Sequence, residues 1–330
     1  MLEIKLIAKL VLLLLLIVGV FLWSDIYLPV HPGTNKVVEF TVQKGQGAKE
    51  ISISLKNEGL IKHTSTFRIY ALLSGKSHKL QAGQYELSLS MSSSQMVDKM
   101  ARGDVKREIV TIIEGWDLRD IAEYFEEQGI STKEQFLDLA KKDFTDGLTI
   151  LQDKPKTVTI EGYVFPDTYE VAPGTGAEDI IKKILSNFDE KLRPELRAEI
   201  EKQKRSIFDI ITAASLIEKE VKSQEDKKVV SGILLKRLAI SMPLQIDATI
   251  TYITGRAAVS FSDLEIDSPY NTYKYYGLPL GPISNPGLES IEAAIYPTMS
   301  DYLYYFTARS GKTIFSKTYA EHQRQLDKYR

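Results

Sequence analysis

The sequence contains no cysteine, which excludes disulfides, thiolate metal sites and cysteine nucleophiles. Histidine is also scarce, and no two histidines share the HExxH spacing or a similar metal-binding spacing. The four histidines are His31, His63, His78 and His322. No GxSxG motif supports a serine nucleophile, and the net charge of −2 gives no basic excess that would favour nucleic acid. We therefore expect no metal, no cofactor and no nucleic-acid partner.

The length and composition indicate a folded protein of two domains. A chain of 330 residues suffices for two domains of the usual ~100–200 residues each. Its apolar share of 43% and charged share of 26% are ordinary for globular proteins, so wholesale disorder is excluded. We find neither an internal repeat nor a low-complexity tract.

An unbroken apolar run occupies residues 10–23, shorter than the ~20 residues that a spanning helix needs. If Lys5 and Lys9 extend their amines to the headgroups, the span grows to Ile4–Tyr27. A signal peptide is the alternative, but the bulky residues 21–27 lack a small-x-small cleavage pattern. We favour a membrane anchor. The positive-inside rule then places the N-terminus in the cytoplasm and the rest of the chain outside it.

The pattern of apolar residues predicts an α+β protein with an N-terminal transmembrane helix, a small α+β module and a larger mixed α+β domain. We place a cytoplasmic tip and transmembrane anchor at residues 1–27, a tether at 28–36, the small module at 37–104 and the larger domain at 105–330. Strands are expected at residues 37–42, 83–87, 105–113, 157–164, 302–307 and 313–315, and residues 244–250 should be extended or mixed. Helices are expected at residues 48–58, 63–73, 94–102, 117–128, 132–141, 177–188, 194–204, 206–221, 226–239, 288–294 and 318–329.

One of these helices carries a carboxyl group in apolar company. Residues 207–217 are nearly all apolar, and Glu218 follows them on the same helix, over Ala214 and Ser215. Apolar surroundings disfavour the charged form of a carboxyl group, and a protonated carboxyl group near neutrality can act as a general acid. The alternative is that Glu218 only marks the solvated end of a core helix. Periodicity alone does not choose between Glu218 and Glu220.

The loop at residues 268–287 is rich in Pro, Gly, Asn and Tyr. Its rings and neutral hydrogen-bonding groups suit a carbohydrate, although a structural loop packed on the core is the alternative. Upstream, residues 244–249 alternate between apolar and polar, which would place Gln245, Asp247 and Thr249 on one side. These three side chains would line a cleft or face water.

Several ordered motifs resemble those of the endolytic murein transglycosylase (MltG or YceG-like) family. They are Glu-Gly-Tyr-Val-Phe-Pro-Asp-Thr-Tyr at 161–169, Ala-Ser-Leu-Ile-Glu-Lys-Glu at 214–220, Pro-Leu-Gln-Ile-Asp-Ala-Thr at 243–249, Ser-Pro-Tyr-Asn-Thr-Tyr at 268–273, Gly-Leu-Pro at 277–279, Gly-Pro-Ile-Ser-Asn-Pro-Gly at 281–287, and Phe-Ser-Lys-Thr-Tyr-Ala-Glu-His at 315–322. The likeness runs from the anchor to the last helix. Val221 and Ile246 depart from it, because threonine is common at both positions in the family.

The resemblance implies a single-pass inner-membrane lyase, with a LysM-like module at residues 37–104 and a catalytic domain beyond it. It implies that Glu218 is catalytic, in a non-hydrolytic cleavage of the MurNAc-β-1,4-GlcNAc bond of nascent peptidoglycan strands that leaves 1,6-anhydro-MurNAc ends and terminates elongation. Glu220 would support Glu218. The candidates for holding the glycan are Gln245, Asp247, Tyr270, Asn271, Thr272 and Asn285. Peptidoglycan synthases are candidate partners. The alternatives are a lysozyme-like hydrolase with Asp247 as second carboxylate, and a non-catalytic glycan-binding scaffold.

Overall fold

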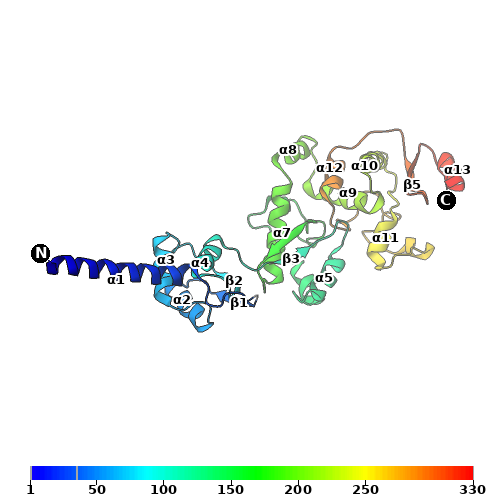
Figure 1. The fold of residues 1–330 in the computed structure, drawn as a ribbon. Helices are drawn as coiled ribbons and strands as arrows, with labels where there is room; N and C mark the ends of the chain where they lie inside the picture. Colours follow the sequence, from blue (N-terminus) through cyan, green and yellow to red (C-terminus); the bar gives the residue numbers. More distant parts are fainter. Residues whose placement is uncertain (1, 35, 330) are drawn as a thin grey trace. The chain divides into compact units, whose positions relative to one another are not determined.

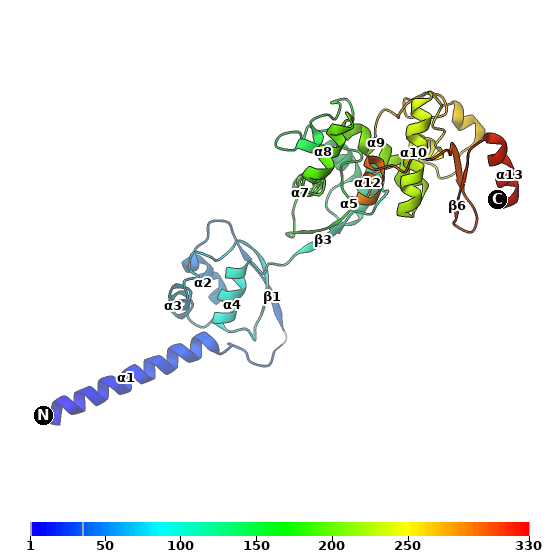
Figure 2. The same cartoon turned by 90° about the horizontal axis from the view of Figure 1, so that it is seen from above.

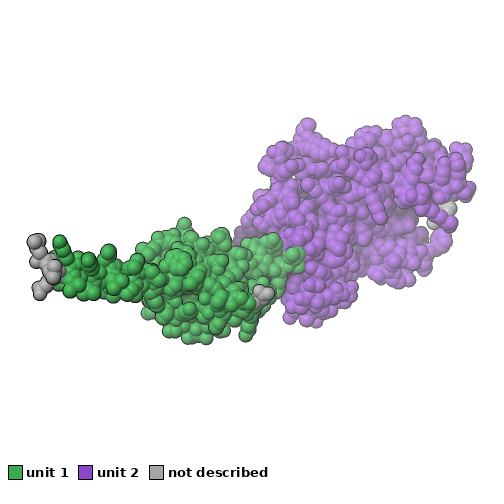
Figure 3. Space-filling view, in the orientation of Figure 1, with its two compact units in different colours: residues 1–109, 170–174 green, residues 110–169, 175–330 purple. Residues whose placement is uncertain are grey.

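The computed structural model describes residues 2–34 and 36–329, which form two compact units. The first unit contains residues 1–109 and 170–174, and the second contains residues 110–169 and 175–330, coloured separately in Figure 3. Helices and strands both occur in each unit, so the protein is a mixed α+β structure, as the sequence predicts.

The first unit begins with a long apolar helix, α1 (Leu2–Tyr27). Within it, Ile4–Tyr27 has a mean hydropathy of 2.9 and exposed apolar side chains, so it is long and apolar enough to cross a membrane. The last turn is different, because Asp25 and Ile26 are buried. The Asp25 carboxylate accepts hydrogen bonds from the hydroxyl of Thr66 and from Nδ1 of His63, the latter at 3.1 Å. These contacts fix the end of α1 to the rest of the first unit.

A small module follows α1, in the order β1 (Val37–Val42), α2 (Ala48–Asn57), α3 (Thr64–Leu73), β2 (Gly83–Ser88) and α4 (Ser93–Arg102). The strands pair antiparallel, in register from Val37 opposite Ser88 to Val42 opposite Gly83. Figure 2 shows the three helices gathered on one side of this pair. All five elements match the predicted elements to within one or two residues. The core between them contains Phe40, Ile51, Leu55, Phe67, Tyr85, Leu87, Met96 and Met100.

The segment at residues 28–36, predicted as a tether, is partly held by the small module. The amide of His31 donates to the carbonyl of Leu89 at 3.4 Å, and the amide of Leu89 donates to the carbonyl of Lys36 at 3.0 Å. The segment therefore runs along the strand end of the module.

The second unit is mainly helical (Figure 1). Its helices are α5 (Leu118–Glu127), α6 (Lys133–Leu139), α7 (Ala177–Lys191), α8 (Pro194–Lys202), α9 (Ile207–Glu220), α10 (Gln224–Ala239), α11 (Asp247–Thr254), α12 (Leu288–Ile295) and α13 (Tyr319–Tyr329), with short 3-10 turns at Thr149–Leu151 and Phe261–Glu265. Strand β3 (Glu108–Thr111) pairs with β4 (Thr168–Val171), and β5 (Tyr304–Thr307) pairs antiparallel with β6 (Thr313–Ser316).

Helix α9 forms the centre of the second unit. The hydroxyl of Ser206 caps it by accepting a hydrogen bond from the amide of Asp209 at 2.9 Å. Every residue from Ile210 to Ile217 is buried, and α10 and α12 both pack against the helix (Figure 1). A helix that is apolar on all sides is stable only in such a covered position. Glu218 and Glu220 lie in its last turn, where the burial ends.

One predicted strand is absent from the structure. Residues 157–164 contain no strand, because Gly162 has a φ of +86° and turns the chain sharply. Residues 244–250, expected to be extended or mixed, are irregular as far as Ile246, and α11 begins at Asp247. The helix turns Thr249 into the core, where it is fully buried, so it does not share a side with Gln245 and Asp247. The strand β4 had no counterpart among the predicted elements.

Candidate active site

The carboxyl group of Glu218 lies at the start of α12. The amide of Gly287 donates to Glu218 Oε2 at 3.0 Å, and the hydroxyl of Ser290 donates to the same oxygen at 2.6 Å. The amide at a helix start carries a partial positive charge, so both contacts favour a carboxylate there. The Glu218 side chain is only 9% exposed, which agrees with the burial predicted for it.

A buried lysine completes the surroundings of Glu218. Nζ of Lys227, from α10, lies 3.4 Å and 3.5 Å from the two carboxylate oxygens, and the Lys227 side chain is 3% exposed. These surroundings are polar, whereas the sequence predicts apolar ones. The prediction was wrong on this point because Lys227, Gly287 and Ser290 come from other parts of the chain. A charged pair this deeply buried is stable only when hydrogen bonds satisfy it, as they do here.

The side chain of Glu220 points to a different part of the molecule, because two residues turn a helix through about 200°. It lines a cavity of about 480 Å³. The cavity lining is Glu220, Arg237, Leu244, Gln245, Asp247, Tyr273, Tyr305, Phe306, Thr307, His322 and Leu326. Burial raises the pKa of Glu220 to about 7, although a hydrogen bond with Tyr305 acts in the opposite direction.

Two of the residues predicted to hold a glycan, Gln245 and Asp247, line this Glu220 cavity. The Asp247 carboxylate accepts a hydrogen bond from the hydroxyl of Tyr273. Gln245 has a φ of +51°, a left-handed conformation that is uncommon for a residue other than glycine and that often marks functional positions. The structure therefore groups Gln245 and Asp247 with Glu220, not with Glu218.

Two further candidates, Asn271 and Thr272, are buried and make only internal hydrogen bonds. The Asn271 amide donates to the carbonyls of Leu264 and Ile266, at 2.9 Å and 2.8 Å. The Thr272 hydroxyl accepts from the amide of Ile246 at 3.0 Å. Both side chains hold the loop in shape through these hydrogen bonds, and the glycan contact expected of them stays a prediction.

Asn285 is likewise fully buried, and the glycan contact expected of it stays a prediction. Its side chain accepts from the amide of Val164 at 2.8 Å, and donates to the carbonyl of Trp116 and to Glu161 Oε1, both at 3.0 Å. All of its hydrogen-bonding groups are engaged. Asn285 thus joins three distant segments and positions Gly287, two residues further along the chain.

Tyr270 lies at a third place, in a cavity of about 350 Å³ beside Glu161, with its ring 5.1 Å from that of Tyr252. Glu161 is buried, and its carboxylate accepts from the amide of Leu118 at 3.0 Å and from the Tyr252 hydroxyl at 3.3 Å. Burial nevertheless raises the pKa of Glu161 to about 8. The sequence analysis named Glu161 only as the first residue of a family motif and gave it no role.

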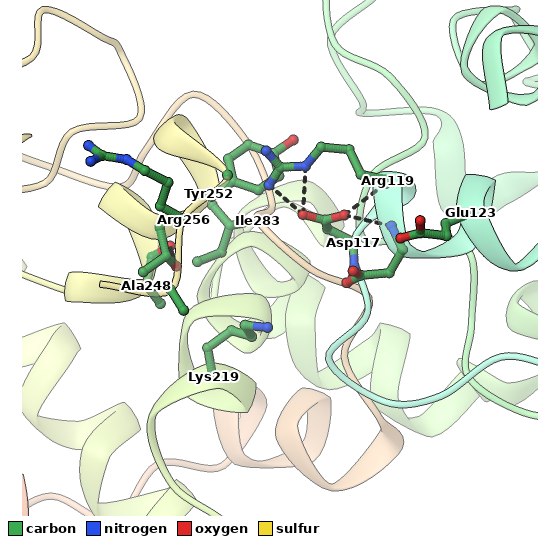
Figure 4. A pocket seen from close by; sticks show the side chains of 12 residues that line it. Asp117, Arg119, Glu123, Lys219, Ala248, Tyr252, Arg256 and Ile283 are labelled. Carbon is green, nitrogen blue, oxygen red and sulfur yellow. Dashed lines mark hydrogen bonds and ion pairs between the residues drawn. The ribbon is translucent and has the colours of Figure 1, made fainter. Parts of the chain in front are cut away.

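A cavity of about 420 Å³ is lined in part by Lys219, the residue that follows Glu218 in the sequence. Figure 4 shows Lys219 between Ala248, Tyr252 and Arg256 on one side and Asp117, Arg119 and Glu123 on the other. A Cβ on Gly115 would lie 3.7 Å from Glu218 Cγ and 3.8 Å from Lys219 Cδ. Both side chains therefore flank Gly115, and of the two it is Lys219 that lines the cavity. Its charged groups and the Tyr252 ring offer contacts for a polar ligand.

Among residues 2–34 and 36–329, no three His, Asp or Glu side chains lie close enough together to hold a metal ion.

Comparison with known proteins assigns the family. The family model described as the YceG-like family matches residues 40–328. The chain belongs to the YceG-like family. The endolytic murein transglycosylase of Bacillus subtilis is 36% identical over 330 residues, which cover 96% of this chain and 91% of that protein. That of Streptococcus pneumoniae serotype 2 is 32% identical, over 92% of this chain and 60% of that protein. The crystal structure of a YceG-like protein from Listeria monocytogenes matches with a TM-score of 0.59 and 35% identity, covering 88% of this chain and all of that chain.

Several groups around Glu218 in this YceG-like chain escaped the sequence analysis. They are Glu114, Lys227, Gly287 and Ser290. Gly287 lay within a quoted motif, but no residue pattern pairs the other three with Glu218. Their only signal was that a buried carboxylate must have partners somewhere in the chain.

Proposed function

We propose that this chain is an endolytic lytic transglycosylase of peptidoglycan, with Glu218 as its acid and base. The identity of 36% to the Bacillus subtilis endolytic murein transglycosylase, along nearly the whole of both chains, carries this proposal. The Glu218 side chain is mostly buried, and the next residue, Lys219, lines a polar cavity; both features support the assignment of the residue.

The proposed reaction uses one carboxyl group twice. Protonated Glu218 gives its proton to the oxygen between MurNAc and GlcNAc, and the bond from that oxygen to the anomeric carbon breaks. The C6 hydroxyl oxygen of MurNAc then bonds to the anomeric carbon, and its proton passes to the Glu218 carboxylate. Between the two steps, Gly287, Ser290 and Lys227 stabilise the carboxylate with the hydrogen bonds described above. The product carries a 1,6-anhydro ring, and no water is consumed.

A lysozyme-like hydrolase with Asp247 as its second carboxylate is less well supported. Two carboxyl groups of a glycosidase must face one bond, about 5–9.5 Å apart. Asp247, the candidate for the second carboxylate, lines the Glu220 cavity, and its charge acts on Glu220. The groups that contact Glu218 do not include Asp247 in the part of the chain that the structure describes.

The Glu220 cavity is a candidate for holding part of the glycan or its attached groups. Gln245 and Asp247 present polar atoms there, and Tyr273 and Phe306 present rings, which together suit sugar hydroxyls and ring faces. Tyr270 is a candidate for a further contact from its own cavity. Glu220 would then contribute to binding, in addition to the supporting role expected for it.

We further propose the arrangement in the cell. Helix α1 anchors the protein as a single span, with Lys5 and Lys9 at its cytoplasmic end and residues 28–330 on the outer side of the inner membrane. Residues 37–104 form the LysM-like module and residues 105–330 the catalytic domain. The β1-α2-α3-β2 order of the small module supports the LysM-like assignment. Peptidoglycan synthases are the partners expected of an enzyme that terminates strands.

Digestion of peptidoglycan strands in water enriched in ¹⁸O tests the reaction type. The full-length protein in detergent should release fragments that end in 1,6-anhydro-MurNAc and carry no ¹⁸O at the new end. Reducing ends labelled with ¹⁸O would instead identify a hydrolase. A scaffold would release no fragments at all.

A further inference from the structure

A second carboxyl group, that of Glu114, lies beside Glu218 across Gly287. The amide of Gly287 donates to Glu218 Oε2 at 3.0 Å. A Cβ built on Gly287 would lie only 2.1 Å from Glu114 Oε1, so the Glu114 carboxyl group rests directly on the Gly287 backbone. With ordinary bond lengths, the two carboxyl groups are at most about 8 Å apart. Gly287 leaves room for Glu114 there because it has no side chain.

The two carboxyl groups differ in their partners. Glu218 accepts hydrogen bonds from Gly287 and Ser290 and pairs with Lys227. Glu114 makes no hydrogen bond or ion pair with any residue of 2–34 and 36–329. Its charge is therefore not compensated by a direct partner, although it lies next to the Glu218 carboxylate.

The contacts of Glu218 create a requirement that Glu114 can meet. Two donors and a lysine contact the Glu218 carboxyl group, and the first step of the reaction needs a proton on it. Two carboxyl groups that share one site cannot both ionise easily. We propose that Glu114 is a positioning residue that keeps one proton on the Glu114–Glu218 carboxyl pair, from which Glu218 delivers it to the glycosidic oxygen. This inference rests on the proposed function. The C6 hydroxyl of MurNAc returns the proton to the pair at the end of the reaction.

The charges around the pair are consistent with this role. Burial raises the pKa of Glu114, and the charge of Glu218 raises it further. The charged groups of the neighbouring elements are Lys219 on α9, Lys227 on α10 and Glu289 on α12. The charge of Lys227 lowers the pKa of Glu114, and the charge of Glu289 raises it. The Glu289 side chain is 57% exposed, so water and salt screen its charge.

The pH dependence of kcat/KM for Glu114→Gln tests the proposal, measured with the full-length protein in detergent. Without the charge of Glu114, the pair should lose its proton more easily, and the alkaline limb of the profile should move about one pH unit lower. The rate on that limb should then fall about tenfold, while the rate on the acidic side stays within about twofold of wild type. Glu289→Gln is the matched control, because it removes a nearby but exposed carboxylate and should leave the limb in place. An unshifted limb in Glu114→Gln, or equal losses at every pH, would overturn the proposal.

A second variant keeps the carboxyl group but moves it. In Gly287→Ala the new methyl group would overlap Glu114 Oε1, so Glu114 must swing away. The backbone of Gly287, with φ of −72° and ψ of 167°, suits alanine, and the amide can still donate to Glu218. The alkaline limb should move in the same direction as in Glu114→Gln. A limb that stays in place would contradict the role of Glu114.

A direct titration separates this inference from the proposed function. NMR of protein labelled with ¹³C at glutamate side-chain carboxyls should show two coupled steps for the pair in wild type, and a single step at lower pH in Glu114→Gln. Independent titration of the two groups in wild type would overturn the proposal whatever the products are. If the two groups titrate as a coupled pair but no anhydro products form, only the proposed reaction is refuted.

Discussion

Gly162 lies in a sharp turn and packs closely against other segments. Its substitution by alanine should therefore destabilise the protein more than the same substitution at Gly147. Its φ of +86° disfavours any side chain, and a Cβ there would lie 2.5 Å from Pro282 Cβ and 2.8 Å from Ile211 Cγ2. Gly147 has a similar φ of +76° but no atom within 4 Å of a Cβ. The left-handed backbone costs an alanine about 1–2 kcal/mol at either position. Overpacking adds about 1–3 kcal/mol at Gly162 alone.

Thermal unfolding of the full-length protein in detergent measures this difference. Gly147→Ala should lower the midpoint of the second unit by about 2–8 °C. Gly162→Ala should lower it by about 2–4 °C more for each additional kcal/mol. Activity should fall with it, because Pro282 and Ile211 lie in the segments that carry Ser284–Gly287 and Glu218. Equal midpoints for the two variants would refute the close packing at Gly162.

Two other groups give further predictions. Burial raises the pKa of Glu161 from 4.5 to about 8, so its contribution to stability is full below about pH 4.5 and is lost as the pH rises through about 8. Wild type should therefore lose more stability between about pH 5 and pH 9 than Glu161→Gln, and parallel unfolding curves would contradict the burial of a titrating group. Lys227→Met leaves the Glu218 carboxylate without its counter-charge, so the free energy of unfolding at neutral pH should fall by about 3–5 kcal/mol. Denaturant titration at neutral and acidic pH checks this, because the loss should shrink when the carboxyl group is protonated.

The sequence predicted the helices and the small module well because their signals are local. Apolar spacing and caps such as Ser206 act within a single turn of helix, so they are visible without the rest of the chain. Residues 157–164 misled the prediction because their apolar side chains are buried by tertiary contacts in a turn around Gly162, not by a sheet. Residues 244–250 were expected to be extended or mixed, and the helix α11 was not predicted because the alternating residues at its start do not follow a helical period.

The site was predictable in part. Glu218 was identified as a buried carboxyl group, but its partners Glu114, Lys227 and Ser290 come from other segments, and no local pattern links them. Asn271 was predicted to hold the glycan because the neutral hydrogen-bonding groups of its loop suit a carbohydrate. A long loop that packs on the core instead needs side chains to satisfy its buried backbone groups. Asn271 has that role, with two carbonyls as acceptors.

The most direct test of the account compares two glutamates of the same helix. Peptidoglycan strands are digested by wild type, Glu218→Gln and Glu220→Gln, all full length and in detergent, and the new ends are counted by mass spectrometry. The account predicts that Glu218→Gln forms no 1,6-anhydro-MurNAc ends at any pH, while Glu220→Gln still forms them with a raised KM. Continued formation of anhydro ends by Glu218→Gln would contradict the central claim.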